Sequence, residues 1–513
     1  MDGRITKLNL EVENEQTSNR RTDEDRSRTL RLLQSTHNRR IAVLPLTNMS
    51  SDAKGEIFSD GMTEELISAL SKIAGLRVIA RTSVMRYKNA RKSIGEIGKE
   101  LNVSAILEGS VRKAENKVRI TIQLADPETE EQMWSEKYDR DLEDIFAVQS
   151  EIAQKVAAEL EVQINKSEKL NLAKKATDSK EAYTLYLECR HFLNTRTEEN
   201  LKKAIERFEK ALEKDPQYAL SYTGVADSYA VLALLEFLPP TEAFPEARTA
   251  AEKALEIDNR LAEAHTSLGV VRFQYDWDWE GAENEFKRAI QLNPSYAAAR
   301  QFYADFLKSQ GRFEEALSEM SQASALDPLS LSINTGLGHV LYLSRQYDRA
   351  IEQYRNTIKL DPNFIQARLW FGRPYLQKRM YKEAIAELDD AVRLSGGSTI
   401  SLAMLAHANG TAGNRDEAEK ILEKLMERSK HQYVPSYWIA MIHVGLGAED
   451  QAFTWIERAF QERSSWLVWA KVEPRFDTLR PDPRFNSLLV RMRLIPKKQS
   501  ALGIRGWLKG PGN

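Results

Sequence analysis

The sequence contains a single cysteine, Cys189, among 513 residues. One thiol excludes an internal disulfide and any Cys-x-x-Cys metal site, and it fits a reducing compartment. The seven histidines are scattered, and no two of them stand four residues apart as ligands on one helix would. We therefore expect neither a metal site nor a cofactor.

Long apolar runs and net charge are also missing. No stretch of about 18 apolar residues could span a membrane, and a net charge of −2 creates no strong field toward nucleic acid or lipid. Residues 1–39 are polar and lack the apolar core of a signal peptide. We expect this segment to be disordered and the protein to be cytoplasmic, with no membrane or nucleic-acid partner.

Motifs for bond chemistry are absent as well. The sequence has no GxxxxGK[ST], GxGxxG or GxSxG. Ser59-Asp60-Gly61 precedes an expected helix and could hold an anion or serve as an ordinary cap, although Asp60 disfavours a phosphate. We expect no catalytic residues.

What the sequence does have is a repeat. Alanines recur every 34 residues, at Ala282, Ala316, Ala350, Ala384, Ala418 and Ala452. Asn293-Pro294, Asp327-Pro328 and Asp361-Pro362 keep the same spacing. A fixed period of this length predicts stacked helical pairs. With Ala204 and Ala247 added upstream, we expect about eight helix pairs over residues 181–463. We expect a C-terminal cap over residues 464–495, which covers the apolar face of the last repeat. Residues 496–513 are expected to form a flexible tail.

The repeats resemble tetratricopeptide repeats. Small residues such as Gly338 and Gly372 fall on first helices, Ala350-x3-Tyr354 on a second, and proline follows the second helix. The resemblance implies that first helices line a concave groove for a peptide or helix of a protein partner. The candidate groove residues are Asn334, His339, Arg368, Tyr375 and His407. The alternative is that they solvate an unused face. Whether the chain forms a homo-oligomer stays open.

Residues 40–163 have a different pattern. Strands are expected at 41–46, 76–80, 105–111, 118–124 and 132–138, and helices from about 58, at 93–101 and at 145–162. This order predicts a compact α/β domain. Residues 164–180 read as a helical linker that continues the closing helix. The expected fold class is thus an α/β domain followed by an all-α tetratricopeptide-repeat superhelix.

Five segments of this domain resemble the TolB-like domain, also described as FlgO-like. They are Ile41-Ala-Val-Leu-Pro-Leu, Phe58-Ser-Asp-Gly-Met-Thr-Glu-Glu-Leu, Arg81-Thr-Ser, Leu107-Glu-Gly-Ser-Val-Arg and Trp134-Ser-Glu-Lys-Tyr-Asp-Arg. In bacteria this domain typically precedes tetratricopeptide repeats and follows an effector: a class III nucleotide cyclase, a winged helix or a kinase. Forty residues are too few for a cyclase or kinase and too polar for a winged helix. We expect the effector to be missing or on another chain, even where a cyclase name attaches by similarity.

A basic stretch lies within the same domain. It contains Arg77, Arg81, Arg86, Lys88, Arg91 and Lys92 and no acidic residue. With Tyr87 among them, these residues suit a nucleic-acid backbone or an acidic protein partner, and we favour the protein partner. The alternative is a solvated face neutralised by the Glu-rich segment 128–131.

Two functional hypotheses follow. The first is a non-catalytic scaffold or adaptor in bacterial signalling or assembly, with a partner segment in the groove. The second is a regulatory module of a nucleotide cyclase or transcription regulator whose effector is on another chain.

Overall fold

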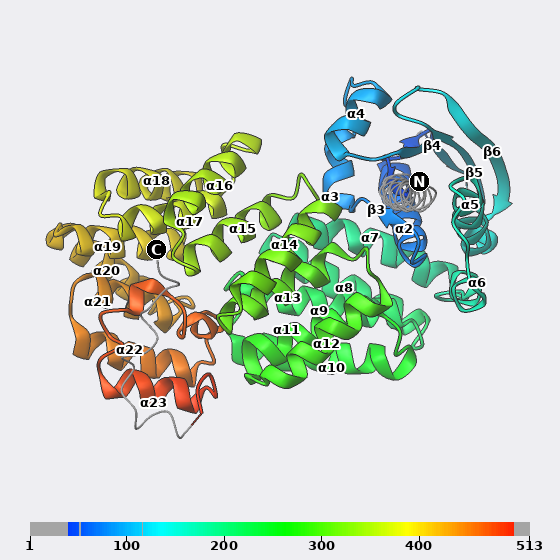
Figure 1. Ribbon diagram of the computed structural model, residues 1–513. Helices are drawn as coiled ribbons and strands as arrows, with labels where there is room; N and C mark the ends of the chain where they lie inside the picture. The colour runs from blue at the N-terminus through cyan, green and yellow to red at the C-terminus, as the bar shows by residue number, and fades with distance from the viewer. Residues whose placement is uncertain (1–38, 51–52, 115, 497–513) are drawn as a thin grey trace, which may run out of the picture.

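The computed structural model describes residues 39–50, 53–114 and 116–496. An α/β unit is followed by helices stacked in antiparallel pairs that curve away from it (Figure 1). The predicted fold class is therefore confirmed. Apart from Arg39 and Pro496, the predicted disordered segment and flexible tail lie outside the described residues.

The sheet of the α/β unit has the order β3-β1-β4-β5-β6, with β2 also paired to β4. The strands are β1 (Arg40–Val43), β2 (Thr47–Asn48), β3 (Arg77–Val78), β4 (Ala105–Ala114), β5 (Lys117–Ala125) and β6 (Gln132–Asp141). The pairings of β1 with β3 and β4 are parallel, whereas β4-β5 and β5-β6 are antiparallel. The alternation of buried and exposed residues along β5 leaves one face of that strand facing the core.

The helices of this unit include α2 (Ala53–Ser71), α3 (Arg81–Val84), η1 (Met85–Tyr87), α4 (Ile94–Leu101), η2 (Leu142–Asp144) and α5 (Ile145–Glu159). Ser93 and Glu96 form a capping box at the start of α4. The expectation that this helix begins near Phe58, with Ser59-Asp60-Gly61 as its cap, is wrong, because α2 already begins at Ala53. Ser59 and Thr63 lie within α2, where their hydroxyls bond the backbone of Leu46 at the end of the first strand segment. Ser59-Asp60-Gly61 therefore has no free helix N-terminus to hold an anion.

The predicted continuous linker helix is also wrong. After α5, Glu161 adopts a left-handed conformation with φ 52°, which ends the helix. A separate helix, α6 (Lys166–Ala173), starts at the capping box of Asn165 and Glu168. The Glu168 carboxylate accepts a hydrogen bond from the Ala74 backbone, 2.9 Å away, so the segment is held against α2's end.

Sixteen helices follow in this part of the described chain, and each consecutive pair packs together. They are α7 (Lys180–Thr195), α8 (Glu198–Lys214), α9 (Ala219–Leu234), α10 (Pro240–Ile257), α11 (Ala262–Val271, extended by η3, Arg272–Asp276), α12 (Trp279–Leu292), α13 (Ala297–Ser309), α14 (Phe313–Leu326), α15 (Leu331–Leu343), α16 (Tyr347–Leu360), α17 (Ile365–Gln377), α18 (Tyr381–Leu394), α19 (Thr399–Ala412), α20 (Arg415–Arg428), α21 (Ser436–Gly445) and α22 (Glu449–Gln461).

Close approach within a pair depends on glycine. A Cβ added at Gly338 on α15 would lie 2.6 Å from the ring of Tyr354 on α16, so no larger residue fits there. Ala350, one turn before Tyr354, is fully buried at the same crossing. The small-residue pattern of the repeat thus sets the distance between helices.

The α/β unit is held against successive repeat loops by hydrogen bonds, which we call the seam. Asn293 donates to Ser71 (3.0 Å), and Ser295 donates to the Leu76 carbonyl (3.1 Å). One repeat further on, the Ala80 amide donates to the Leu326 carbonyl (2.8 Å) and Ser83 donates to Asp327 (2.5 Å). The Asx-Pro loops therefore end helices and also position the α/β unit.

Candidate protein-binding surface

The first helices α7 to α21 of the pairs lie side by side and form the inner face of the superhelix. The chain after α22 returns across this face. It contains η4 (Ser465–Trp469), η5 (Pro474–Phe476) and α23 (Pro483–Arg491). We call residues 465–494 the strap. In Figure 1 its orange-red ribbon lies among the helices from α15 to α22.

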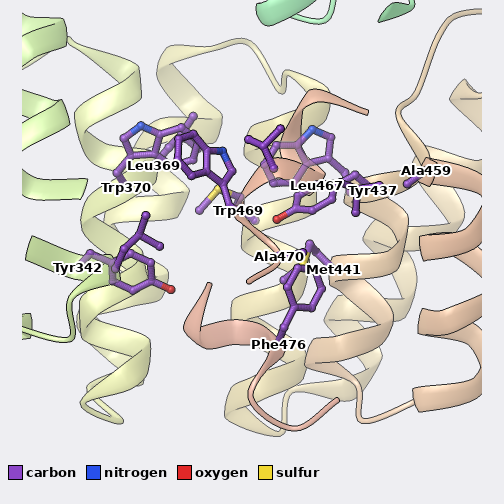
Figure 2. Close-up of a cluster of buried hydrophobic side chains, with 14 of the residues drawn as sticks. Tyr342, Leu369, Trp370, Tyr437, Met441, Ala459, Leu467, Trp469, Ala470 and Phe476 are labelled. Carbon is purple, nitrogen blue, oxygen red and sulfur yellow. The ribbon is translucent and has the colours of Figure 1, made fainter. Parts of the chain in front are cut away.

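Two tryptophans fix the strap to the first helices. The Trp469 ring contacts Phe273 at 5.9 Å and His339 at 5.2 Å between centroids. The Trp466 ring meets Trp370 at 5.3 Å. Figure 2 shows Trp469, Leu467 and Ala470 between Tyr342 and Trp370 on one side and Tyr437 and Met441 on the other. Leu467, Val468 and Ala470 are fully buried, so the strap belongs to the core of this half.

A buried ion pair network lies beside the tryptophans. Glu473 of the strap pairs with Arg373 of α17 (3.4 Å) and with Arg475 (3.0 Å), and none of these side chains is more than 1% exposed. Tyr342 donates a hydrogen bond to the same carboxylate at 2.5 Å. Burial alone would raise the pKa of Glu473, but Arg475 and Arg373 lower it to about 2. The carboxylate is therefore charged at neutral pH and holds two guanidinium groups.

Further contacts close the superhelix on itself. The Trp438 indole on α21 donates to Glu236 in the α9–α10 loop, 2.6 Å away and 202 residues earlier. Trp277 packs on Phe460 of α22 at 5.0 Å, and Trp279 donates to the Met492 carbonyl at 3.0 Å. These tryptophans serve as packing anchors between distant repeats.

The five predicted groove residues do not share one open surface. His339 faces the strap, and the Nδ1 of His407 lies 2.7 Å from the Met441 carbonyl. Both are 5% exposed, and Tyr375 is 8% exposed. Asn334 and Arg368 bond instead to their own loops and to the neighbouring second helices, as in the Arg368–Glu387 pair (2.7 Å). Partner binding by these five residues stays a prediction.

Burial changes the titration of the two histidines. It lowers the pKa of His407 to about 3, with Arg475 adding to the effect. The pKa of His339 falls well below its ordinary value because of burial, Lys308 and Arg373. Both imidazoles are therefore neutral inside the strap-filled half.

Arg373 is the residue that our sequence reasoning missed. It stands 34 residues after His339 and 34 before His407, so it occupies the same position of the repeat. Its charge within the otherwise apolar stretch from Leu369 to Leu376 was a usable signal. The structure shows that its side chain is fully buried and stacks on Trp370, 3.8 Å from the ring centroid.

The basic stretch is largely paired within the protein. Arg81 pairs with Glu64 (3.2 Å), Lys88 with Glu56 and Asp60 (2.6 Å each) and Lys92 with Glu100 (2.5 Å). Arg86 donates to the Leu360 carbonyl of the repeats (3.3 Å). Arg77 and Arg91 are exposed. The acids that neutralise the stretch are thus on α2 and α4, not in segment 128–131 as the alternative supposed.

The strap reaches back to η3 through Trp469 and to Glu236 of the α9–α10 loop through Trp466. Among the described residues, none of its bonds or ring contacts is made to a side chain of α7 or α9. There α2 meets the repeats through Glu64, which accepts from Arg190 of α7 (2.8 Å). Glu65, Asp227 and Glu263 lie around this pair and are each only partly buried. Burial raises the pKa of Glu65 to about 7 and that of Asp227 to about 6. We call these charged residues of α2, α7, α9 and α11 the interdomain surface.

Residues 39–50, 53–114 and 116–496 contain no group of three or more side chains placed to hold a metal ion. Within the same residues, no helix is both long and apolar enough to cross a bilayer.

Comparisons with known proteins agree with this architecture. Profiles described as tetratricopeptide repeat match residues 278–332 and 335–399. A profile described as HilA/YgeH-like transcriptional regulator, second domain, matches residues 37–155. The chain therefore carries tetratricopeptide repeats behind a domain similar to the second domain of these regulators.

The similar curated proteins are longer than the matched region. A Rhizobium meliloti protein named "Putative adenylate cyclase 3" is 35% identical over 236 residues, 45% of this chain and 40% of its own length. Transcriptional regulator HilA of Salmonella typhimurium is 27% identical over 144 residues, 28% of this chain and 26% of its own. The match thus spans less than half of each relative.

Solved structures were also among the matches. The structure titled "Functional Characterization of Pseudomonas Aeruginosa pilF" has a TM-score of 0.31 and 24% identity, over 41% of this chain and 95% of that one. The peptide-binding tetratricopeptide protein YrrB has a TM-score of 0.27 and 21% identity, over 38% and 95%.

Proposed function

We propose that this protein is a non-catalytic scaffold that holds a segment of a partner protein on the interdomain surface. One observation carries the proposal: the strap fills the inner face from α13 to α21, while the interdomain surface keeps partly exposed charged side chains. A partner at His339 or His407 would first have to remove the strap. That step would expose Leu467, Val468 and Trp469, and fully exposing each such side chain costs about 1.5–3 kcal/mol.

The interdomain surface has two properties of a binding site. It lies between two structural units, where ligand sites often occur. Its carboxylates have displaced pKa values, a feature that gathers at functional sites. The Glu64–Arg190 pair also connects α2 to α7, so a bound segment would touch both units.

The biological setting is part of the same proposal. We place the chain in the bacterial cytoplasm, in signalling, and take its N-terminal unit to be TolB-like. Buried Cys189 and the sequence segments quoted above support this placement. No catalytic domain is assigned to the chain, and the cyclase name of the Rhizobium relative is not transferred to it.

A test needs the partner first. Cross-linking of the intact protein in its native cytoplasm, followed by purification, would supply one. The purified partner is then titrated against the wild type, Glu263→Arg and Glu280→Arg. Both glutamates lie in the first turn of a helix, but Glu280 is exposed on the second helix α12. We expect about a tenfold weaker Kd for Glu263→Arg only, or about 1.4 kcal/mol. Equal binding by all three would contradict the proposal.

A second candidate function rests on the sequence comparisons. The N-terminal match to a transcriptional regulator and the 236-residue match to a protein named as a cyclase favour a regulatory module acting on a separate effector. The test is to mix the pure chain with an effector encoded beside it and measure effector activity. If the chain changes the effector's activity and Glu263→Arg abolishes that change, the same site serves both partner binding and regulation.

A further inference from the structure

An acidic groove crosses the outer face of the first two repeats. It runs between α8 and α10 over α9 and encloses about 440 Å³. Tyr222, Val225 and Tyr229 form its floor, with Leu212 and Ala250 on the walls. The two tyrosines are only partly buried. This part of the described surface offers an apolar and aromatic base that is open to a ligand.

The rim of the groove carries excess negative charge. Glu209, Glu246 and Glu252 are exposed and form no ion pair among the described residues, whereas Glu256 is paired with Lys253 (2.8 Å). The pKa of Tyr229 is raised by burial and by Glu209 and Glu246, which lie on opposite walls. The fitting ligand is therefore a segment with cationic side chains and an aromatic or aliphatic group for the floor.

The chain itself contains such a segment. Residues 497–513 carry Lys497, Lys498, Arg505 and Lys509 and no acidic side chain. Ile504, Trp507 and Leu508 supply apolar groups within five positions. This composition complements the groove in both charge and apolar character.

The end of the strap lies within reach. The Met492 carbonyl is bonded to Trp279, and nearby Tyr275 stacks on Phe244 of α10 at 5.6 Å between centroids. Glu246 follows Phe244 by two residues, or about 3 Å along the helix axis. The stretch 497–508 can extend about 40 Å. Length therefore does not prevent docking.

We propose that residues 497–513 dock into the acidic groove of the same molecule, with Arg505 and Lys509 at its carboxylates and Trp507 on its tyrosines. Tethering makes the docking intramolecular, so it is independent of protein concentration. This docking is separate from partner binding at the interdomain surface, so the failure of either proposal leaves the other intact.

Hydrogen–deuterium exchange of the full chain tests the docking. We expect amides of residues 501–510 to exchange about tenfold more slowly than in the free peptide 497–513. Glu209→Lys combined with Glu246→Lys should abolish this protection. Adding Arg505→Glu and Lys509→Glu to that variant should restore it, because the charges again match.

Controls separate docking from other effects. Glu314→Lys combined with Glu352→Lys reverses two exposed charges on other second helices and should leave the protection unchanged. Exchange as fast as in the free peptide overturns the proposal. Protection that rises with protein concentration also overturns it, since it would mean that the segment binds a second copy. Circular dichroism checks that each variant is folded.

Discussion

The strap and the seam both attach other parts of the chain to the repeats, but by different physics. Apart from the seam, the α/β unit also shares an apolar core with the first repeats, where Leu66 belongs to the same buried cluster as Leu187 and Phe208. The strap is attached by buried aromatic rings and one enclosed carboxylate, in contacts that span up to 213 residues. The seam consists of hydrogen bonds between loop backbones and small polar side chains. The burial of apolar area stabilises the folded state strongly but has no preferred direction. Each hydrogen bond adds only about 0.5–1.5 kcal/mol net, but it fixes the orientation of the two groups that it joins. One attachment therefore supplies stability and the other supplies geometry.

The largest expected effect is at the centre of the strap. Trp469→Ala should lower the free energy of unfolding by about 3–5 kcal/mol, because it leaves a cavity between Phe273 and His339. Denaturant titration of the repeats, followed by circular dichroism, measures it. An unchanged midpoint would mean that the strap does not stabilise the repeats, and the contrast between a stabilising strap and an orienting seam would fail.

Removing one partner of the buried network should be the next in size. Arg373→Met leaves Arg475 as the one cationic partner that the structure describes for Glu473, and we expect a loss of about 3 kcal/mol, at the low end for a broken buried pair. Arg345→Met is the matched control at the rim, where Arg345 and Asp477 are 43% and 34% exposed. The control should cost no more than about 1 kcal/mol. Equal losses of stability for the Arg373 and Arg345 variants would contradict the burial of the network around Glu473.

Acid should weaken the strap before the seam. His407 has a folded-state pKa of about 3, below its unfolded value near 6.5, so only the unfolded state takes up the proton between these pH values. Its stabilising contribution is present above pH 6.5 and is lost toward pH 3, by about 1.4 kcal/mol per pH unit. Glu473 adds a loss between its unfolded value and about pH 2. In thermal melts, His407→Gln should flatten the dependence of the melting temperature on pH over about two pH units, from pH 6 to pH 4. An equally steep dependence would refute this assignment.

The smallest effect belongs to the seam. Ser83→Ala removes donation to Asp327 and acceptance from the Leu329 amide, and should cost about 1–2 kcal/mol. We expect the loss to be local, visible as faster hydrogen exchange in β3 and α3 with an unchanged midpoint for the repeats. Ser344→Ala, which removes a bond within its own helix end, is the control. A global shift in stability would show that the seam also carries the core.

Local features were predictable from the sequence because they depend on neighbours. The period of 34 gave the paired helices, and Ser93-x-x-Glu96 marked the start of α4 through the bonds of a capping box. Asx-Pro dipeptides indicated helix ends by proline's missing donor. Each of these signals acts within a few residues.

Long-range features were not predictable. The strap was expected to cap the last repeat, and its helix α23 does lie on α22, where Arg491 pairs with Glu457. Its Trp469, however, also reaches Phe273 and His339, which lie 196 and 130 residues earlier in the chain. Nothing local to Asp327 indicates that it will bind Ser83. His339 and Tyr375 were read as lining an open groove because the repeat pattern places them on first helices. That pattern carries no information on what fills the inner face of the superhelix. Such pairings are fixed by how the whole chain packs.

The bond between Trp438 and Glu236 has a consequence for the evolution of this chain. Open repeat arrays can gain or lose a unit at little cost, because each unit touches only its neighbours. Here α21 must meet the α9–α10 loop, and the indole–carboxylate contact is 2.6 Å. Adding or deleting one repeat would rotate these partners apart. The number of repeats in this protein should therefore be inherited as a fixed quantity, as it is in a closed barrel or propeller.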